Sequence, residues 1–154
     1  MRIYKCNEII ISFDETQLLK KVEEHLNKNQ TETGGIITGF YSSNLLEACI
    51  TNFYHPPKDS KLGATSFVRG IYGLDKILHH EWKNGKYYLG DWHLHPYNTP
   101  MASCQDRKQL ALNSEDKDLH CPEPIMIIVG GVYNKDINVY IFIENQIYLC
   151  EEVS

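Results

Sequence analysis

Apolar residues recur along the chain with two different periods, and these periods divide it into strands and helices. The run EIIISF at 8–13 is short and apolar, which predicts a buried strand. Residues 14–29 predict an amphipathic helix, because their apolar residues fall on one helical face: Leu18, Leu19, Val22 and Leu26. Asp14 and Gln17 have the spacing of a capping box, which marks the start of this helix.

The next part of the chain predicts a hairpin followed by a loop. Residues 31–41 place Gly34 and Gly35 before an apolar strand. Residues 45–55 alternate between apolar and polar positions, so we expect them to pair with that strand across a polar turn. The stretch 56–66 is rich in Pro, Gly and Ser and predicts a loop.

A second helix and a further strand follow this loop. Residues 71–85 predict the helix, because apolar residues recur at helical spacing: Leu74, Ile77, Leu78 and Trp82. We expect His79, His80 and Glu81 to form its polar face. Aromatic and apolar residues alternate in 86–96, which predicts a strand.

The last third of the chain predicts a helix from Ser103 to about Asn113 and then three strands, at 125–133, 137–144 and 146–150. Helices placed among strands that are partly joined by hairpins predict an α/β or α+β fold around one mixed sheet. We expect residues 1–154 to form a single domain, since this length is ordinary for one hydrophobic core.

Charge and cysteine content narrow the class of protein. The formal net charge is −5 without a long run of one sign, which argues against nucleic acid as a partner. Five cysteines are scattered without a Cys-x-x-Cys pair, which fits neither a disulfide framework nor a four-cysteine zinc site. No segment approaches about 18 consecutive apolar residues or resembles a signal sequence, so we expect a cytoplasmic protein without a membrane partner.

The stretch from Gly90 to Asp106 carries candidate metal ligands. In a strand, His93 and His95 point to the same face, about 6.6 Å apart along it. Ser103 and Asp106 are neighbours on the first turn of the predicted helix, and the proline-broken interval between strand and helix can return Asp106 to the histidines. Two histidines and one carboxylate around a tetrahedral ion leave a position for water, as in catalytic zinc sites.

Simpler interpretations of these residues remain open at this point. Surface strands carry His-x-His pairs by chance, and Ser103 with Asp106 also has the spacing of a capping box. The Cys104 thiol is a candidate nucleophile, although beside metal-binding imidazoles we expect it to ligate or to stay inert. Asp91 shares the strand face of the histidines, which makes it a candidate ligand or a partner that orients an imidazole.

Two other metal motifs are excluded. HHEWK at 79–83 is not the His-Glu-x-x-His motif, because Asn84 stands where the second histidine is needed. The same histidines are not followed by the Pro-Cys-x-x-Cys of nucleobase deaminases, since HCPEP at 120–124 contains only Cys121. His120 and Cys121 alone cannot form a second zinc site.

These residues resemble the JAMM motif of the Mov34/MPN/PAD-1 family of zinc-dependent isopeptidases. The motif runs His-x-His, seven residues, Ser-x-x-Asp; His93, His95, Ser103 and Asp106 match it without a gap. The upstream ETGGIITG is similar to the family's Glu-x-Gly-Gly strand opening, which puts Glu32 in the place of the family's glutamate. The resemblance covers most of the chain and implies the MPN/JAB-type, cytidine-deaminase-like fold, a curved mixed sheet flanked by helices.

The resemblance also implies a role for each of these residues. His93, His95 and Asp106 would hold Zn²⁺, whose bound water then has a pKa of about 7. Glu32 would take the water's proton and deliver it to the departing amine. Ser103 would donate a hydrogen bond to the developing oxyanion.

Within the family, SFVRG at 66–70 and YYLGDWHLHP at 87–96 look most like small bacterial proteins found with ubiquitin-like conjugation machinery. Those include the isopeptidase of antiphage cyclic-nucleotide signalling operons, the CBASS type. Relatives there usually carry Ser-Phe-x-Arg-Asp and Gly-Glu-Trp-His-Thr-His-Pro. This chain departs from them at Gly70, Asp91 and Leu94, which leaves the five-residue site unchanged.

The implied partner is a protein substrate with an extended C-terminal tail, either ubiquitin-like or a nucleotidyltransferase conjugate. Such a tail would add to a strand edge near the site. The loop 55–66 and the segment 113–123 are candidate walls of that groove, while Phe67 and Arg69 are alternatively structural anchors of the loop.

Two rival functions remain. A processing peptidase for ubiquitin-fold sulfur-carrier proteins would use the same chemistry on another substrate. A non-catalytic MPN interaction scaffold would bind partners without metal, but such scaffolds usually lose motif residues, and all five are present here.

Overall fold

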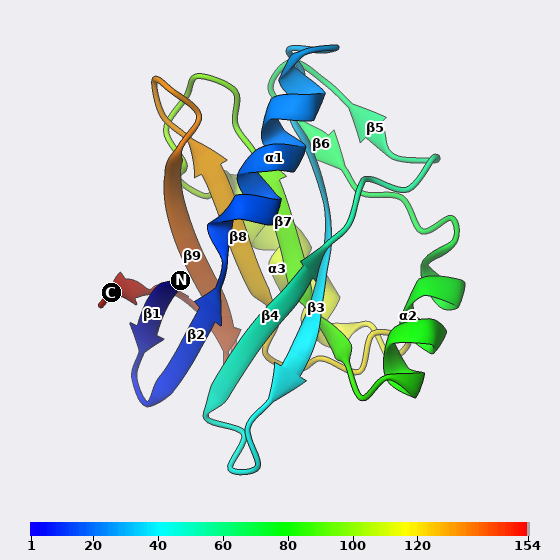
Figure 1. Ribbon diagram of the computed structural model, residues 1–154, viewed down its shortest axis with the longest axis vertical. Coiled ribbons are helices and arrows are strands. Elements are labelled where there is room, and N and C mark those ends of the chain that lie inside the picture. The colour runs from blue at the N-terminus through cyan, green and yellow to red at the C-terminus, as the bar shows by residue number, and fades with distance from the viewer. Residues whose placement is uncertain (154) are drawn as a thin grey trace.

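The computed structural model describes residues 1–153, in which a curved nine-stranded sheet is accompanied by three helices (Figure 1). The helices are α1 (Glu15–Leu26), α2 (Leu74–Lys83) and α3 (Cys104–Glu115). The sheet contains β1 (Arg2–Cys6), β2 (Ile9–Phe13), β3 (Thr33–Tyr41), β4 (Glu47–Phe53), β7 (Tyr87–Leu94), β8 (Ile125–Gly130), β9 (Asp136–Ile143), β10 (Gln146–Leu149) and β11 (Glu151–Glu152). A separate hairpin pairs β5 (Lys61–Leu62) with β6 (Phe67–Val68).

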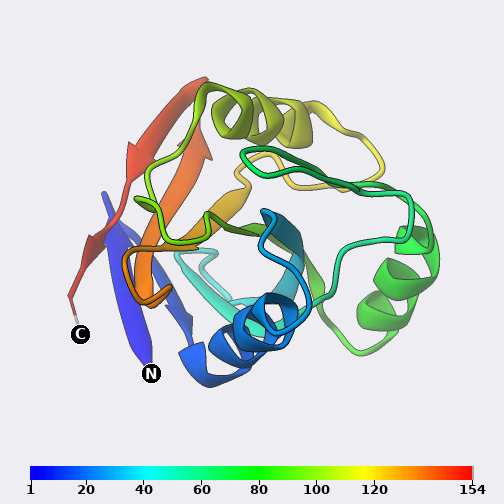
Figure 2. The same ribbon diagram turned by 90° about the horizontal axis from the view of Figure 1, so that it is seen from above.

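The predicted mixed sheet is confirmed. Its strand order is β10-β9-β8-β7-β3-β4-β2-β1-β11, with β2–β4 and β7–β8 parallel and the other neighbouring pairs antiparallel. β10 and β11 stand at opposite ends of this order, although only Cys150 separates them in the chain. The sheet therefore curls until its two edges nearly meet (Figure 2).

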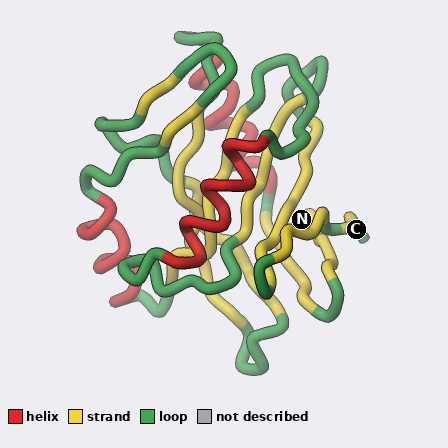
Figure 3. The backbone as a smooth tube through the Cα atoms, turned by 180° about the vertical axis from the view of Figure 1, so that it is seen from behind, coloured by secondary structure: helices red, strands yellow, loops and turns green. Residues whose placement is uncertain are grey.

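Helices cover both faces of the sheet. Side chains alternate between the faces along each strand, and both faces carry apolar residues that a helix buries. Ile37 belongs to the core cluster that contains Leu18 and Val22 of α1. Its neighbour Ile36 packs with Leu74 of α2 on the opposite face. α3 lies across this second face (Figure 3), over a cluster formed by Leu110, Met126, Ile128, Tyr140 and Phe142. None of the helices within residues 1–153 is long and apolar enough to cross a membrane.

Four strands lie where the sequence predicts none: β1, β5, β6 and β11. The first two show the reason. Arg2–Cys6 forms β1, because it pairs along its whole length with β2. The loop predicted for 56–66 is wrong at Lys61–Leu62, which forms β5 and pairs with β6 across a turn closed by the Gly63 amide and the Ser66 carbonyl. Both strands depend on pairing with other segments, and the local composition does not show that pairing.

The capping box predicted for α1 is half correct. Asp14 caps the helix by accepting a hydrogen bond from the Thr16 amide at 3.0 Å. The Gln17 side chain instead accepts from the Phe53 amide at 2.8 Å and donates to the Thr51 carbonyl at 3.4 Å. These bonds tie α1 to β4, a tertiary use of Gln17 that its spacing from Asp14 cannot distinguish from a cap.

The buried face of α2 differs from the prediction at two positions. Trp82 is 64% exposed, whereas Glu81 is buried and accepts a hydrogen bond from the Tyr54 hydroxyl. Glu81 lies seven residues after Leu74 and therefore on the same helical face, so it turns inward where that hydroxyl satisfies its carboxylate. His79 and His80 are exposed, as the predicted polar face requires.

A β-bulge in β7 decides which side chains share a face. Successive residues of β3 pair with Gly90 and Tyr88, so Leu89 is an extra residue in β7. Without that residue, Tyr88 and Asp91 would point to opposite faces; with it, the Tyr88 hydroxyl donates to the Asp91 carboxylate at 2.7 Å. The bulge thus decides that Tyr88, Asp91 and His93 share one face of β7.

Gly90 allows the bulge to pack against β8. Its φ is +154°, and a Cβ atom there would lie 1.8 Å from the Ile125 carbonyl oxygen. We expect Gly90→Ala to lower the free energy of unfolding by about 3 kcal/mol. In Gly73→Ala, the control at φ +80° with nothing within 4 Å, the loss should be about 1 kcal/mol. Urea denaturation measures both, and equal losses would contradict the proposed backbone contact.

Candidate metal centre

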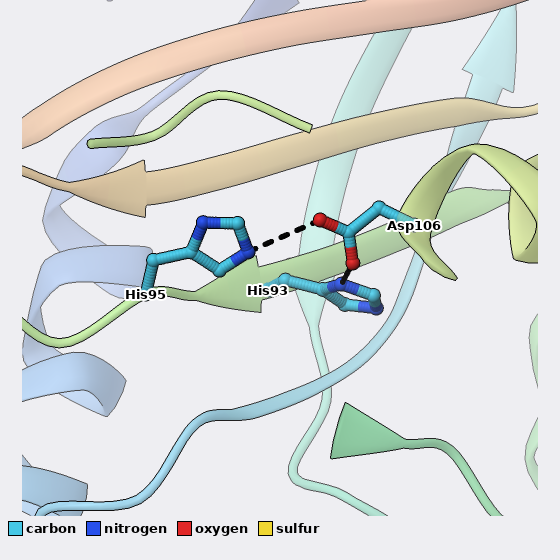
Figure 4. Close-up of side chains that lie close together, drawn as sticks. All are labelled: His93, His95 and Asp106. Carbon is cyan, nitrogen blue, oxygen red and sulfur yellow. Dashed lines mark hydrogen bonds and ion pairs between the residues drawn. The ribbon is translucent and has the colours of Figure 1, made fainter. Parts of the chain in front are cut away.

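Two histidines at the end of β7 and a carboxylate on the first turn of α3 converge in the fold (Figure 4). Asp106 Oδ1 lies 2.9 Å from His93 Nδ1, and Asp106 Oδ2 lies 3.1 Å from His95 Nε2. One ligand atom of each residue lies within 4.8 Å of the other two. All three residues are buried, and the interval before α3 returns Asp106 to the histidines, as predicted.

The start of α3 places Asp106. Ser103 is the N-cap: its Oγ accepts from the Asp106 amide at 3.1 Å, and its own amide donates to Asp106 Oδ2 at 2.9 Å. The capping box and the candidate metal group therefore share Asp106, and the capping interpretation of the Ser-x-x-Asp pattern is confirmed. The helix is fixed to the sheet by Leu110 and by a hydrogen bond from the Ala102 amide to the Tyr140 hydroxyl at 3.0 Å.

The backbone beside His95 orients its ring. The His95 amide donates to the Val129 carbonyl of β8 at 2.8 Å, which extends the strand pairing past the end of β7. His95 Nδ1 lies 3.1 Å from the Thr99 carbonyl oxygen, an acceptor for the ring N–H. This contact leaves Nε2 directed at Asp106, in the way a backbone carbonyl commonly orients a metal-binding imidazole.

The His93 ring is held by packing. The Phe67 ring stands nearly perpendicular to it, with ring centres 5.2 Å apart. Gly34 makes room for both rings, since a Cβ atom there would lie 2.8 Å from the His93 imidazole and 2.9 Å from the Phe67 ring. His93 Nε2 is buried and has no hydrogen-bond partner among residues 1–153.

The donor set fits a zinc ion. Two imidazoles and a carboxylate are ligand types that Zn²⁺ accepts, and one ligand atom from each residue lies within 4.8 Å of the others. Two ligands about 2.1 Å from a tetrahedral ion lie about 3.4 Å apart. The separations between Asp106 and the histidines, 2.9 and 3.1 Å, are close to that value.

Contacts between Asp106 and the two histidines shift the pKa values of Asp106 and His95. Burial alone would raise the pKa of Asp106, but hydrogen bonds with His93 and His95 and with the Ser103 amide hold this pKa far below its usual range. Burial alone would lower the pKa of His95, but its contact with Asp106 raises that pKa above the ordinary value. In the metal-free group His95 therefore keeps its proton to a higher pH than an ordinary histidine, and below that pH a cation would have to displace the proton.

Glu32 lies just before β3, at the edge of the group. Its Oε1 is 4.0 Å from His95 Nε2, and its amide donates to the Gly63 carbonyl of the β5–β6 hairpin at 2.9 Å. Burial raises the pKa of Glu32, which makes this carboxylate a better proton acceptor near neutral pH.

Two further candidates lie outside the metal group. The carboxylate of Asp91 is occupied on both oxygens, by Arg69 Nε at 2.7 Å and by the Tyr88 hydroxyl at 2.7 Å, so it is not a ligand. Cys104 is an exposed free thiol at the first residue of α3. Sequence patterns missed Tyr88 as a partner of Asp91, because the bulge that brings them together changes the expected alternation.

A curved mixed sheet that carries these histidines and a helix-capping aspartate is the architecture of a JAB-type domain. The chain belongs to that family: residues 15–141 match the family described as prokaryotic homologs of the JAB domain. The resemblance to the MPN/JAMM proteins is thereby confirmed.

Comparison with individual proteins agrees with this assignment. A protein of Enterobacter hormaechei subsp. hoffmannii named "CD-NTase/cGAS isopeptidase" is 43% identical over 110 residues. The match covers 71% of this chain but only 61% of that relative's length. A solution structure of a Desulfitobacterium hafniense protein shares the fold with a TM-score of 0.65 at 13% identity, over 90% of this chain and 88% of the other.

The Ser103 cap can be tested separately from chemistry. We expect Ser103→Ala to lower the free energy of unfolding of the metal-free protein by about 1 kcal/mol, because the Asp106 amide loses its acceptor. Ser103→Thr keeps the acceptor and should retain most of the stability. Urea denaturation in the presence of a chelator measures both variants. An alanine variant as stable as the threonine variant would contradict the capping role.

Proposed function

We propose that residues 1–154 form a single JAMM domain that acts as a zinc-dependent isopeptidase. It would hydrolyse an isopeptide or peptide bond after the C-terminal tail of a ubiquitin-like or conjugated partner, such as a nucleotidyltransferase conjugate in bacterial antiphage defence. The observation that carries the proposal is the buried convergence of His93, His95 and Asp106 beside Glu32, whose pKa is raised. The name of the 43%-identical relative supports this class of substrate.

His93, His95 and Asp106 would hold the zinc ion. When bound, zinc supplies Lewis acidity, which makes water acidic enough to attack an amide at neutral pH. The protein contributes a buried donor set whose geometry is fixed by the Ser103 cap and by the pairing of β7 with β8. Burial also keeps bulk water from competing for these donors.

Glu32 would act as general base and then as general acid. Its carboxylate accepts a proton from the attacking water, and the same proton passes to the nitrogen of the departing amine as the carbon–nitrogen bond breaks. The raised pKa of Glu32 lies closer to neutral pH than that of an ordinary carboxylate, and there one group can both accept a proton and give it back. Its 4.0 Å separation from His95 Nε2 keeps Glu32 adjacent to the metal group without a direct hydrogen bond.

Ser103 would stabilise the oxyanion. Its Oγ already accepts from the Asp106 amide, so the hydroxyl proton remains available for donation to a substrate carbonyl. The side chain is exposed at the start of α3, which lets a substrate reach it. A hydrogen bond that strengthens as charge develops on the carbonyl oxygen lowers the barrier of the reaction.

The substrate tail would bind extended beside the β5–β6 hairpin, within the loop 55–66 that we predicted as a wall. The segment 113–123 would form the facing wall. Two-residue strands leave the hairpin with free edges to which an extended peptide can add.

A processing peptidase for sulfur-carrier proteins would use the same geometry, and only its substrate would differ. The scaffold alternative is disfavoured, since four of the five motif residues are buried or partly buried around one another. We also propose that the protein acts in the cytoplasm, where thiols stay reduced. The described cysteines are all free.

Zinc binding should be stoichiometric and pH-dependent. We expect about one zinc per chain, lost in Asp106→Ala. Because the raised pKa of His95 keeps a proton on a ligand, apparent zinc affinity should decline as the pH falls, starting above pH 6.5, the ordinary histidine value. Calorimetric titration in buffers of different ionisation enthalpy measures affinity and proton release. Unchanged affinity between pH 8 and pH 6, or a metal-replete alanine variant, would contradict the assignment.

The proton-transfer role of Glu32 can be tested independently of zinc binding. We expect Glu32→Gln to keep zinc but to lose cleavage by about 100-fold or more, because the amide cannot accept the water's proton. The assay follows cleavage of a fusion in which a nucleotidyltransferase C-terminal tail precedes a reporter protein. Glu24→Gln, which changes an exposed acid on α1, is the matched control. Full turnover by the Glu32 variant would remove Glu32 from the mechanism.

A further inference from the structure

The β5–β6 hairpin touches both halves of the proposed catalytic apparatus. The Phe67 ring packs edge-on against His93, with 82° between the ring planes. At the tip of the same hairpin, the Gly63 carbonyl accepts the hydrogen bond of the Glu32 amide. One short element therefore contacts a candidate zinc ligand and the candidate general base.

The Phe67 ring helps to orient the His93 imidazole by packing against it, whereas a hydrogen bond to the Thr99 carbonyl orients His95. Metal-binding histidines usually donate their second N–H to a carbonyl, carboxylate or water, and His95 has the Thr99 carbonyl for this purpose. His93 contacts Asp106 through Nδ1, but its Nε2 has no partner within residues 1–153. The orientation of the His93 ring therefore depends on Asp106 at one edge and on the packing of Phe67.

The hairpin cannot hold this position by itself. Each strand has two residues, and the pair forms a sheet separate from the main one. An isolated two-stranded hairpin is marginally stable in water. Its location must come from contacts with the rest of the fold.

A buried ion pair directly after β6 supplies such a contact. Arg69 Nε donates to Asp91 Oδ2 at 2.7 Å, and their side chains are 5% and 0% exposed. The other Asp91 oxygen accepts from Tyr88, and Arg69 Nη2 donates to Asn113 Oδ1 at 3.2 Å. Asp91 belongs to β7 and Asn113 to α3, the two elements that carry the metal group.

Further hydrogen bonds close the base of the hairpin. The Gly70 amide donates to Ser60 Oγ at 2.9 Å. The Asp59 carboxylate accepts from the Ile71 and Tyr72 amides at 3.1 and 2.9 Å. The chain before β5 is thus joined to the chain after β6 beside Arg69, so displacement of Arg69 would move the whole hairpin.

We propose that the Arg69–Asp91 pair is a positioning device for the metal centre. It holds the hairpin against β7 and α3, so that Phe67 fixes the His93 ring and Gly63 fixes the backbone of Glu32. Arg69, Asp91, Tyr88 and Phe67 act through other residues and do not touch the reacting atoms. This inference rests on the proposed function, because it concerns the same metal centre.

The test removes both charges of the pair. Arg69→Met alone leaves a buried unpaired carboxylate and can unfold the protein, whereas Arg69→Met/Asp91→Asn leaves no unpaired charge and keeps an acceptor for the Tyr88 hydroxyl. In the folded double variant we expect zinc affinity, measured by competition with a chromophoric chelator, to fall about 10- to 100-fold. The visible absorption spectrum of the cobalt(II)-loaded protein should change with it.

Two single hydroxyl deletions provide a matched comparison. Tyr88→Phe removes a hydrogen bond to the buried Asp91 carboxylate, and Tyr54→Phe removes the equivalent bond to the buried Glu81 carboxylate on α2. We expect only Tyr88→Phe to weaken zinc binding. A general loss of stability would affect both variants alike, so this comparison separates positioning from folding.

Hydrogen exchange tests the hairpin without metal. In the metal-free double variant, the amides of Glu32 and Gly63 should exchange faster than in the wild type, while amides of β8 should not. Wild-type zinc affinity, cobalt spectrum and exchange in the folded double variant would overturn the inference and leave the proposed function intact. A wild-type protein that binds no zinc would overturn both.

Discussion

The Asp106 carboxylate is the interaction on which the rest of the site depends. Its two oxygens join the start of α3 to the end of β7, through the Ser103 amide on one side and two imidazoles on the other. A buried carboxylate is costly unless it is fully hydrogen-bonded, and here local capping and tertiary contacts satisfy it together. The same group that starts a helix therefore also fixes the distance between helix and strand.

The face of β7 that carries Tyr88 and Asp91 connects the candidate metal group to the rest of the fold. A bulge at Leu89 and Gly90 brings Tyr88 and Asp91 onto one face, and Asp91 can then pair with Arg69 from a segment outside the main sheet. The pairing of Arg69 with Asp91 holds the β5–β6 hairpin over His93. The fold thus combines a strand of the main sheet, which leads into the candidate ligands His93 and His95, with a short covering hairpin positioned by charge.

Sequence patterns predict the parts of this structure that depend on local periodicity and on fixed spacing. The mixed sheet, the helix capped at Ser103 and the convergence of Asp106 with the histidines all follow from such patterns. Features that depend on distant partners do not. Lys61–Leu62 is a strand only because β6 pairs with it, and Gln17 bonds to β4 instead of its own helix. Glu81 is buried because it accepts a hydrogen bond from the hydroxyl of Tyr54, which directly follows β4. Helical spacing alone cannot reveal this partner.

X-ray absorption at the zinc edge tests the central claim most directly, because it identifies the ligand atoms independently of activity. The zinc-loaded protein should show only nitrogen and oxygen neighbours at about 2.0–2.2 Å, with the multiple-scattering signal of two imidazoles. A sulfur neighbour at about 2.3 Å would place the ion at a cysteine, and a shell without imidazole would exclude the histidines. Either result would contradict a zinc centre formed by His93, His95 and Asp106.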